Sequence, residues 1–110
     1  MKIIYNKILP LGKKFYAINL FGVLFSKGPL SAVSLNHEKI HTAQIRELFY
    51  LPFYVVYIME WAIRTVIYGN YFKAYKNISF EREAYLKESD LSYLERRRAY
   101  SFLKYFRASK

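Results

Sequence analysis

The chain has 110 residues, which is enough for a single domain over 1–110, and its hydrophobic content of 54% excludes an intrinsically disordered protein. It contains no cysteine, which excludes disulfides, thiolate metal ligands and cysteine nucleophiles. The formal net charge of +10 favours anionic partners such as lipid headgroups. Nucleic acid is the less favoured partner, because no nucleic-acid fold signature accompanies the charge.

The N-terminal quarter predicts a loop followed by a small β element. Residues 1–7 lack the apolar core and the cleavage site of a signal peptide, so we expect a cytoplasmic or membrane-associated protein. Residues 1–14 are mixed in composition, and Pro10 and Gly12 within them predict a loop. Residues 15–27 are rich in aromatic and β-branched types, which is typical of two short strands or a β-hairpin. Residues 27–29 predict the turn that closes this unit.

The rest of the chain carries helical patterns. A first helix is predicted over about 34–50, because Ser34 can cap it and apolar residues recur at helical spacing until Pro52. The remaining segments predict a helix over about 52–68 stopped by Gly69 and Asn70, and a loop or frayed turn over 70–78. They further predict a helix over about 80–88 capped by Ser79, and a helix from Ser89 or Asp90 to about 106. The expected fold is therefore mainly α with a small β-hairpin, an α+β class.

The segment 48–68 has two interpretations. Its first twelve residues are uncharged and mostly large and apolar, but the full segment includes Glu60 and Arg64. Charges within a membrane span are costly, although these two residues are four positions apart and can pair. The segment is either a buried core helix or a helix that contacts a membrane, as a span or along an interfacial face.

The first predicted helix carries the most informative motif of the chain. Its residues His37-Glu38-Lys39-Ile40-His41 form H-E-x-x-H and include both histidines of the sequence. Positions i and i+4 lie on one face of a helix, so the two imidazoles can bind one metal ion. Glu38 then lies beside the metal, where it can take a proton from a bound water. This arrangement is typical of zinc-dependent hydrolases.

A catalytic zinc site usually needs a third protein ligand, and here it must be a carboxylate, because no other histidine and no cysteine exist. The best source is the segment 79–85, which places Glu81 and Glu83 at the start of a separate helix. Either acid is a candidate at this point. The alternative is that both belong to an ordinary solvated helix start, where acids are favoured by the helix dipole.

The combination of H-E-x-x-H with a later E-x-x-A helix resembles the gluzincin metallopeptidases, which include thermolysin-like enzymes and membrane proteases of the prenyl-protein type. In the latter, the glutamate that opens an E-x-x-A-D stretch is the third zinc ligand. The resemblance implies a minimal zincin-like domain with zinc bound by His37, His41 and Glu81, and with Glu38 as the general base. Tyr85 stands where the family has an acid that orients a ligand histidine, so that role is unassigned.

The expected function is hydrolysis of peptide bonds in a peptide or protein substrate. By the same resemblance, a strand within 15–25 would pair with the extended substrate backbone. Tyr85 and Tyr100 are candidates for stabilising the oxyanion, because no histidine is left for that role. The alternatives are a non-catalytic zinc-binding protein and a module that binds an anionic membrane surface. The sequence does not indicate the oligomeric state.

Overall fold

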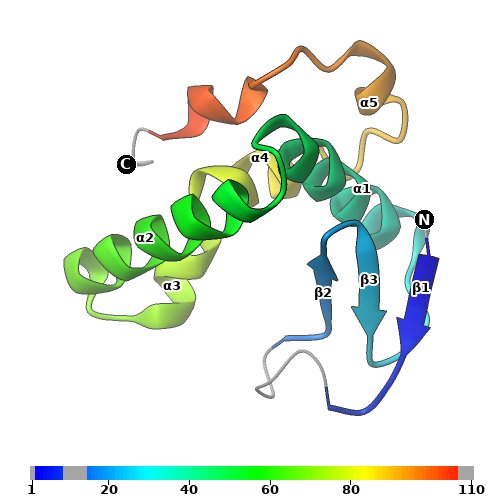
Figure 1. The fold of residues 1–110 in the computed structure, drawn as a ribbon, viewed down its shortest axis with the longest axis horizontal. Coiled ribbons are helices and arrows are strands. Elements are labelled where there is room, and N and C mark those ends of the chain that lie inside the picture. The colour runs from blue at the N-terminus through cyan, green and yellow to red at the C-terminus, as the bar shows by residue number, and fades with distance from the viewer. Residues whose placement is uncertain (1, 9–14, 107–110) are drawn as a thin grey trace.

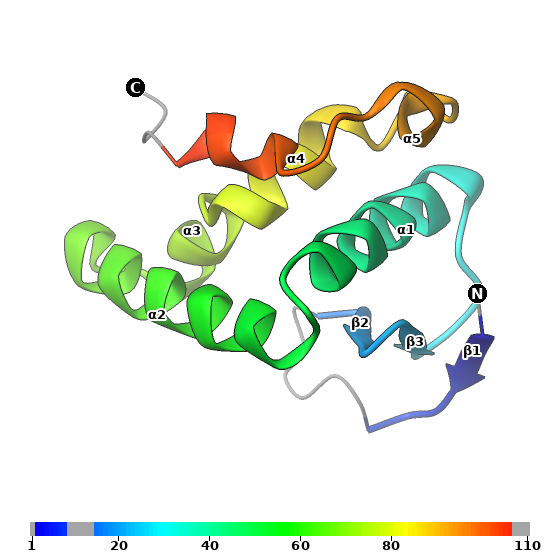
Figure 2. The same cartoon turned by 45° about the horizontal axis from the view of Figure 1, so that its top comes forward.

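Three short strands and six helical segments make up residues 2–8 and 15–106, the part of the chain that this computed structural model describes (Figure 1). In chain order they are β1 (Lys2–Tyr5), β2 (Ala17–Leu20), β3 (Val23–Ser26), α1 (Ala32–Glu47), α2 (Leu51–Tyr68), α3 (Tyr71–Lys76), α4 (Ser79–Lys87), α5 (Tyr93–Arg96) and the 3-10 helix η1 (Ser101–Tyr105). The sheet lies below α1, and α4 lies on the other side of that helix (Figure 2). The mainly α class with a small β element is confirmed.

The sheet has the order β1-β3-β2, with β2 antiparallel and β1 parallel to β3. The hairpin predicted over 15–27 is present, and it turns at Phe21 and Gly22, which both have positive φ. Two successive positive φ values suit the right-handed twist of the flanking strands. No strand was predicted within 1–14, but β1 forms there, because this strand is defined by pairing with a segment some twenty residues away. The loop predicted at Pro10 and Gly12 lies outside the described residues.

Helix α1 begins earlier than predicted. Ser31, not Ser34, is its N-cap, and the Ser31 hydroxyl accepts a hydrogen bond of 3.1 Å from the backbone N–H of Ser34. The helix ends at Glu47, and a tight turn leads into α2, which has a proline in its first turn. Gly69 ends α2 in the left-handed conformation, as predicted.

The segment after Gly69 was predicted as a loop or a frayed turn, but it forms the helix α3. The side chain of Asn70 caps this helix by accepting hydrogen bonds from the backbone N–H groups of Phe72 and Lys73. Ser79 was predicted to cap the following helix, α4, but it donates instead, from its backbone N–H and its hydroxyl, to the carboxylate of Glu60. The carboxylate of Glu60 on α2 therefore accepts the hydrogen bonds of Ser79, the first residue of α4, as a side-chain cap would.

The continuous helix predicted up to residue 106 is broken into α5 and η1. Arg97 ends α5 in an extended conformation, and Tyr100 adopts a left-handed one. The physical reason is an ion pair: the extended backbone lets the Arg97 side chain reach Glu47 on α1 and Glu83 on α4, at 2.7 and 2.6 Å.

The apolar core lies between α1, α2, α4 and η1. It consists of Ile45, Phe53, Ile78, Phe80 and Phe102, with partly buried aromatic side chains of α2 packed against it. This core fixes α4 against α1, which is the relation on which the predicted metal site depends. Within residues 2–8 and 15–106, no helix combines the length and the apolar character that a membrane crossing requires.

Candidate metal centre

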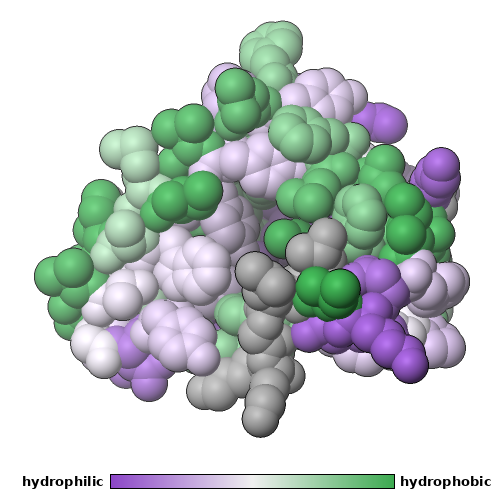
Figure 3. Space-filling view, turned by 60° about the horizontal axis from the view of Figure 1, so that its bottom comes forward, coloured by the Kyte–Doolittle hydropathy of each residue, from purple (hydrophilic) through white to green (hydrophobic). Residues whose placement is uncertain are grey.

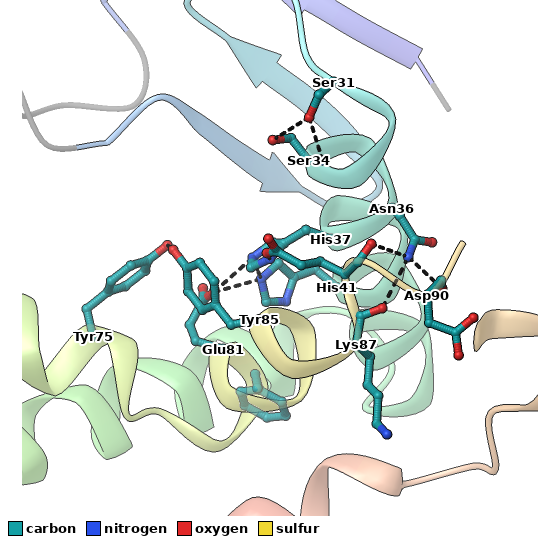
Figure 4. A network of polar contacts seen from close by, with 12 residues as sticks. Ser31, Ser34, Asn36, His37, His41, Tyr75, Glu81, Tyr85, Lys87 and Asp90 are labelled. Carbon is teal, nitrogen blue, oxygen red and sulfur yellow. Dashed lines mark hydrogen bonds and ion pairs between the residues drawn. The ribbon is translucent and has the colours of Figure 1, made fainter. Parts of the chain in front are cut away.

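Helix α1 presents His37 and His41 on the face that packs against α4 (Figure 4). Their spacing of one helical turn places them on one face, and their Nε2 atoms are 3.1 Å apart. Both side chains are buried, so the two imidazoles are withdrawn from bulk water.

Glu81, in the first turn of α4, completes the group. Its Oε1 atom lies 3.1 Å from the Nε2 of His37 and 3.0 Å from the Nε2 of His41. The three atoms thus form a nearly equilateral triangle. A tetrahedral zinc with bonds of about 2.0–2.1 Å places its ligand atoms about 3.3 Å apart, so the triangle has close to the size of one face of such a site. His37, His41 and Glu81 are the candidate metal-binding group of the described chain.

The tautomer of His41 is fixed by Gln44. The amide nitrogen of Gln44 donates to the carbonyl oxygen of Phe80 at 3.0 Å and to Glu83 at 2.9 Å, so its oxygen must face His41. That oxygen lies 2.8 Å from the Nδ1 atom of His41. Nδ1 is therefore the donor, and in the neutral ring Nε2 carries a lone pair directed at the centre of the triangle.

His37 is held in the same way by Glu88. The Nδ1 atom of His37 donates to the Glu88 carboxylate at 2.8 Å, which leaves its Nε2 as an acceptor in the neutral ring. Two nitrogen lone pairs and the carboxylate oxygen of Glu81 then converge within about 3 Å. Such a cluster of acceptors is stable only around a cation.

In the absence of a metal ion, a proton is the available cation. Burial lowers the pKa of His41, but the charge and the hydrogen bond of Glu81 outweigh burial and raise this pKa to about 9. Burial also acts to raise the pKa of Glu81, yet the two imidazoles outweigh it and hold this pKa well below its usual range. Metal binding at this site therefore competes with one proton.

The second oxygen of Glu81 is occupied by Tyr57 from α2. The Tyr57 hydroxyl donates to Oε2 at 2.6 Å, and burial, followed by the charge of Glu81, raises the pKa of Tyr57 well above its usual value. This phenol is therefore always a donor, and it leaves Oε1 directed at the imidazoles.

Glu38 lies beside the triangle and lines a cavity of about 460 Å³. Burial raises the pKa of Glu38, although the nearby His41 and His37 act to lower it. The cavity is also lined by His41, by Glu81 and by apolar and aromatic side chains, among them Phe53, Tyr54, Tyr57, Trp61 and Tyr75. A carboxyl group whose pKa is raised by burial thus adjoins a space of ligand size.

Strand β2 forms the wall of this cavity opposite the helices. Its residues Ala17–Leu20 line the cavity, and the sheet order makes β2 an edge strand. The side-chain amide of Asn19 donates to the backbone oxygen of Glu38 at 3.1 Å, which ties the strand to the motif helix. The hydroxyl of Tyr54 donates to the backbone oxygen of Asn19 and accepts from the N–H of Phe21, so part of the outer edge is already used.

The alternative third ligand, Glu83, lies away from the imidazoles. Residues two apart on a helix are separated by about 200° around its axis, so Glu83 points to the opposite side of α4 from Glu81. There its carboxylate accepts hydrogen bonds from Gln44, Tyr93 and Arg97. Its charge is thus matched within the fold, by a basic residue on the chain segment that follows α5.

The oxyanion candidates lie in different places. The ring of Tyr85 packs edge-on against His37, with centroids 4.5 Å apart, and its hydroxyl is 3.4 Å from that of Tyr75. Tyr100 lies at the other end of α1, where its backbone N–H donates to the Glu47 carboxylate. The structure therefore brings Tyr85 to the site and places Tyr100 outside it.

Sequence reasoning missed the two residues that orient the imidazoles, Gln44 and Glu88. Both had a usable signal: Gln44 lies three residues after His41, and Glu88 lies seven residues after Glu81, on the same helical face. Glu88 is thus the acid in contact with the Nδ1 atom of His37, whereas Tyr85 contacts the ring of His37 edge-on. Comparison with family models, curated proteins and solved structures finds no match to this chain.

Proposed function

We propose that the chain is a minimal zinc-dependent metallopeptidase, with zinc held by His37, His41 and Glu81. The observation that carries the proposal is the convergence of three acceptor atoms within about 3 Å, beside Glu38 and at the wall of a cavity. The donor set of two imidazoles and one carboxylate suits zinc and leaves a fourth position for water. Zinc bound there would supply Lewis acidity, which makes water a nucleophile near neutral pH.

Glu38 is the general base in this proposal. Its carboxylate accepts the proton of the attacking water and later delivers it to the nitrogen of the leaving amine. Burial raises its pKa, which makes the protonated form accessible for the second transfer. Gln44 and Glu88 hold the two imidazoles in the tautomer that ligation needs, and Tyr57 holds Glu81.

The surroundings of Glu38 favour an extended peptide as the substrate. The large apolar cavity and a smaller one of about 230 Å³ share Ala17 and Glu38 in their linings. The smaller cavity is more polar and is lined in part by Ser34, His37 and Glu88. A peptide lying along β2 would place residues on either side of its scissile bond in the two cavities. We propose that the protein hydrolyses peptide or protein substrates in the cytoplasm or at a membrane surface.

The second candidate is a non-catalytic zinc site that stabilises the fold. It is favoured by the burial of the ligand group, since His37, His41 and Glu81 are each exposed by 6% or less. A zinc ion between α1 and α4 would join segments forty or more residues apart in the chain. A zinc site that only stabilises the fold needs no general base. The effect of replacing Glu38 on cleavage therefore distinguishes the two candidate functions.

The test compares the wild type with Glu38→Gln, with Lys39→Gln as an exposed neighbouring control. Zinc content and cleavage of an unfolded protein substrate are measured for each. We expect one zinc per chain in all three and a loss of cleavage of about 10²–10⁴-fold in Glu38→Gln alone.

Cleavage that is unchanged in Glu38→Gln would refute the general base, and a wild type that binds no zinc would refute the metal site. A wild type that binds zinc, cleaves no substrate and unfolds on chelation would establish the stabilising site instead.

A further inference from the structure

Helix α2 distributes its apolar and charged side chains in the opposite way to a surface helix of a water-soluble protein. Such a helix buries an apolar stripe and exposes its charges. In α2 every exposed residue is apolar; the nine are Leu51, Pro52, Val55, Ile58, Met59, Ala62, Ile63, Val66 and Ile67. The seven larger aliphatic side chains among them are each exposed by 51% to 84%. These nine residues are called the α2 face below.

The two charged residues of α2 point inward and are fully paired. Arg64 donates to Glu60 at 2.8 Å and to the backbone oxygen of Phe106 at 2.6 Å. Glu60 accepts further hydrogen bonds from the backbone N–H and the hydroxyl of Ser79. Both side chains are about nine-tenths buried. The interior of the fold thus satisfies the charges, and the α2 face carries none.

The α2 face is continuous along the helix. Its residues recur at intervals of three and four, so they form one stripe over about 27 Å for an 18-residue helix. Phe49, in the turn before α2, is a further apolar residue with an exposure of 78%. Apolar side chains are gathered along the left of the space-filling view, the side on which α2 lies (Figure 3). Most soluble proteins expose apolar residues singly, whereas here they form one contiguous surface along the helix.

The charges around the α2 face indicate which partner covers it. Helices α2 and α3 contain a single acidic residue, the buried Glu60. Exposed Arg46 lies in the last turn of α1, shortly before α2, and exposed Lys73 on α3 places its ammonium over the ring of Tyr68, the last residue of α2. Exposed Tyr50 and Tyr71 adjoin the ends of the helix, as aromatic residues do at membrane interfaces. A second copy of this chain fits poorly, because it would bring together two chains of net charge +10.

We propose that the α2 face docks on a bilayer that contains anionic lipids, with α2 lying in the plane of the interface. The aliphatic side chains enter the boundary between headgroups and acyl chains, and the flanking lysine and arginine side chains contact phosphates. This orientation needs no membrane span and matches a helix whose charges all face the protein. The proposal does not depend on the metal centre, so the two are tested separately.

The experiment is flotation with vesicles of phosphatidylcholine containing 30% phosphatidylserine, compared with pure phosphatidylcholine. The variant Ile63→Glu places a charge in the middle of the α2 face. The matched control is Leu91→Glu, because Leu91 is an aliphatic residue with the same exposure of 59% outside α2. Circular dichroism verifies that both variants fold.

We expect the wild type and Leu91→Glu to float with the anionic vesicles. The partition coefficient should fall at least tenfold in Ile63→Glu, and at least fivefold for the wild type on pure phosphatidylcholine. Equal binding of Ile63→Glu and the wild type would overturn the docking face, and equal binding to both vesicles would overturn the anionic preference. A wild type that ignores vesicles but forms a dimer, which Ile63→Glu abolishes, would assign the face to a second copy instead.

Discussion

Arg97, the middle residue of three consecutive arginines, joins the C-terminal segment to α1 and α4 through ion pairs. Arg97 has a side-chain exposure of 5%, and its guanidinium pairs with Glu47 on α1 and with Glu83 on α4. The Glu83 side chain is fully buried. Replacement of Arg97 by methionine keeps the aliphatic stem and removes the charge. Two carboxylates are then left within the fold without their cation.

The expected cost follows from this burial. Removal of one partner of a buried ion pair destabilises a protein by about 3–5 kcal/mol, because the remaining charge is not compensated. Glu83 keeps hydrogen bonds from Gln44 and Tyr93, which favours the lower part of this range. At about 4 °C per kcal/mol for a chain of this size, a loss of about 3–4 kcal/mol should lower Tm by about 12–16 °C.

Thermal and urea unfolding of Arg97→Met measure the effect, and Arg96→Met is the matched control. Arg96 is the preceding residue and also pairs with an acid, Asp90, but its side chain is 58% exposed. An ion pair exposed to water contributes little to stability, so the control should stay near the wild type. In the Arg97→Met background, Glu83→Gln should restore part of the lost stability. A loss below about 1 kcal/mol in Arg97→Met, or no rescue by Glu83→Gln, would refute the reasoning.

Two further predictions concern the metal centre. Gln44→Leu removes the acceptor of the His41 Nδ1–H, so zinc affinity should fall about 10- to 100-fold in competition with a chromophoric chelator; an unchanged affinity would contradict the orienting role of Gln44. Zinc at about 100 times its dissociation constant should stabilise the wild type by about 2.7 kcal/mol, and a chelator should reverse this. Glu81→Ala should show a much smaller rise in Tm and Glu83→Ala the full rise, and an equal rise in both would remove Glu81 from the ligand group.

Features that depend on neighbouring residues were predictable from the sequence. The spacing of His37 and His41 places them on one face of a helix, and the structure has them there. The hairpin followed from its β-branched and aromatic composition, and the end of α2 followed from Gly69. The position of Glu81 beside the imidazoles was expected from the family resemblance and not from spacing.

Features that depend on distant contacts were not predictable. The helix expected up to residue 106 is interrupted because Arg97 pairs with acids on two other helices, and no local pattern encodes that. The sequence gives three arginines in a row and does not distinguish the buried one from its exposed neighbour. Ser79 has the local features of a cap, but its hydroxyl donates a hydrogen bond to the carboxylate of Glu60 on α2 instead. In each case tertiary contacts outweigh local preference.

Tyr57 lies on the inner side of α2, where its hydroxyl orients the Glu81 carboxylate. The exposed residues on the outer side of the same helix are all apolar. A rotation of α2 about its own axis would withdraw this phenol and let the carboxylate turn. Any contact that immobilises the outer side of α2 therefore also restrains the carboxylate of Glu81, so the geometry of the buried triangle depends on contacts made at the outer surface of this helix.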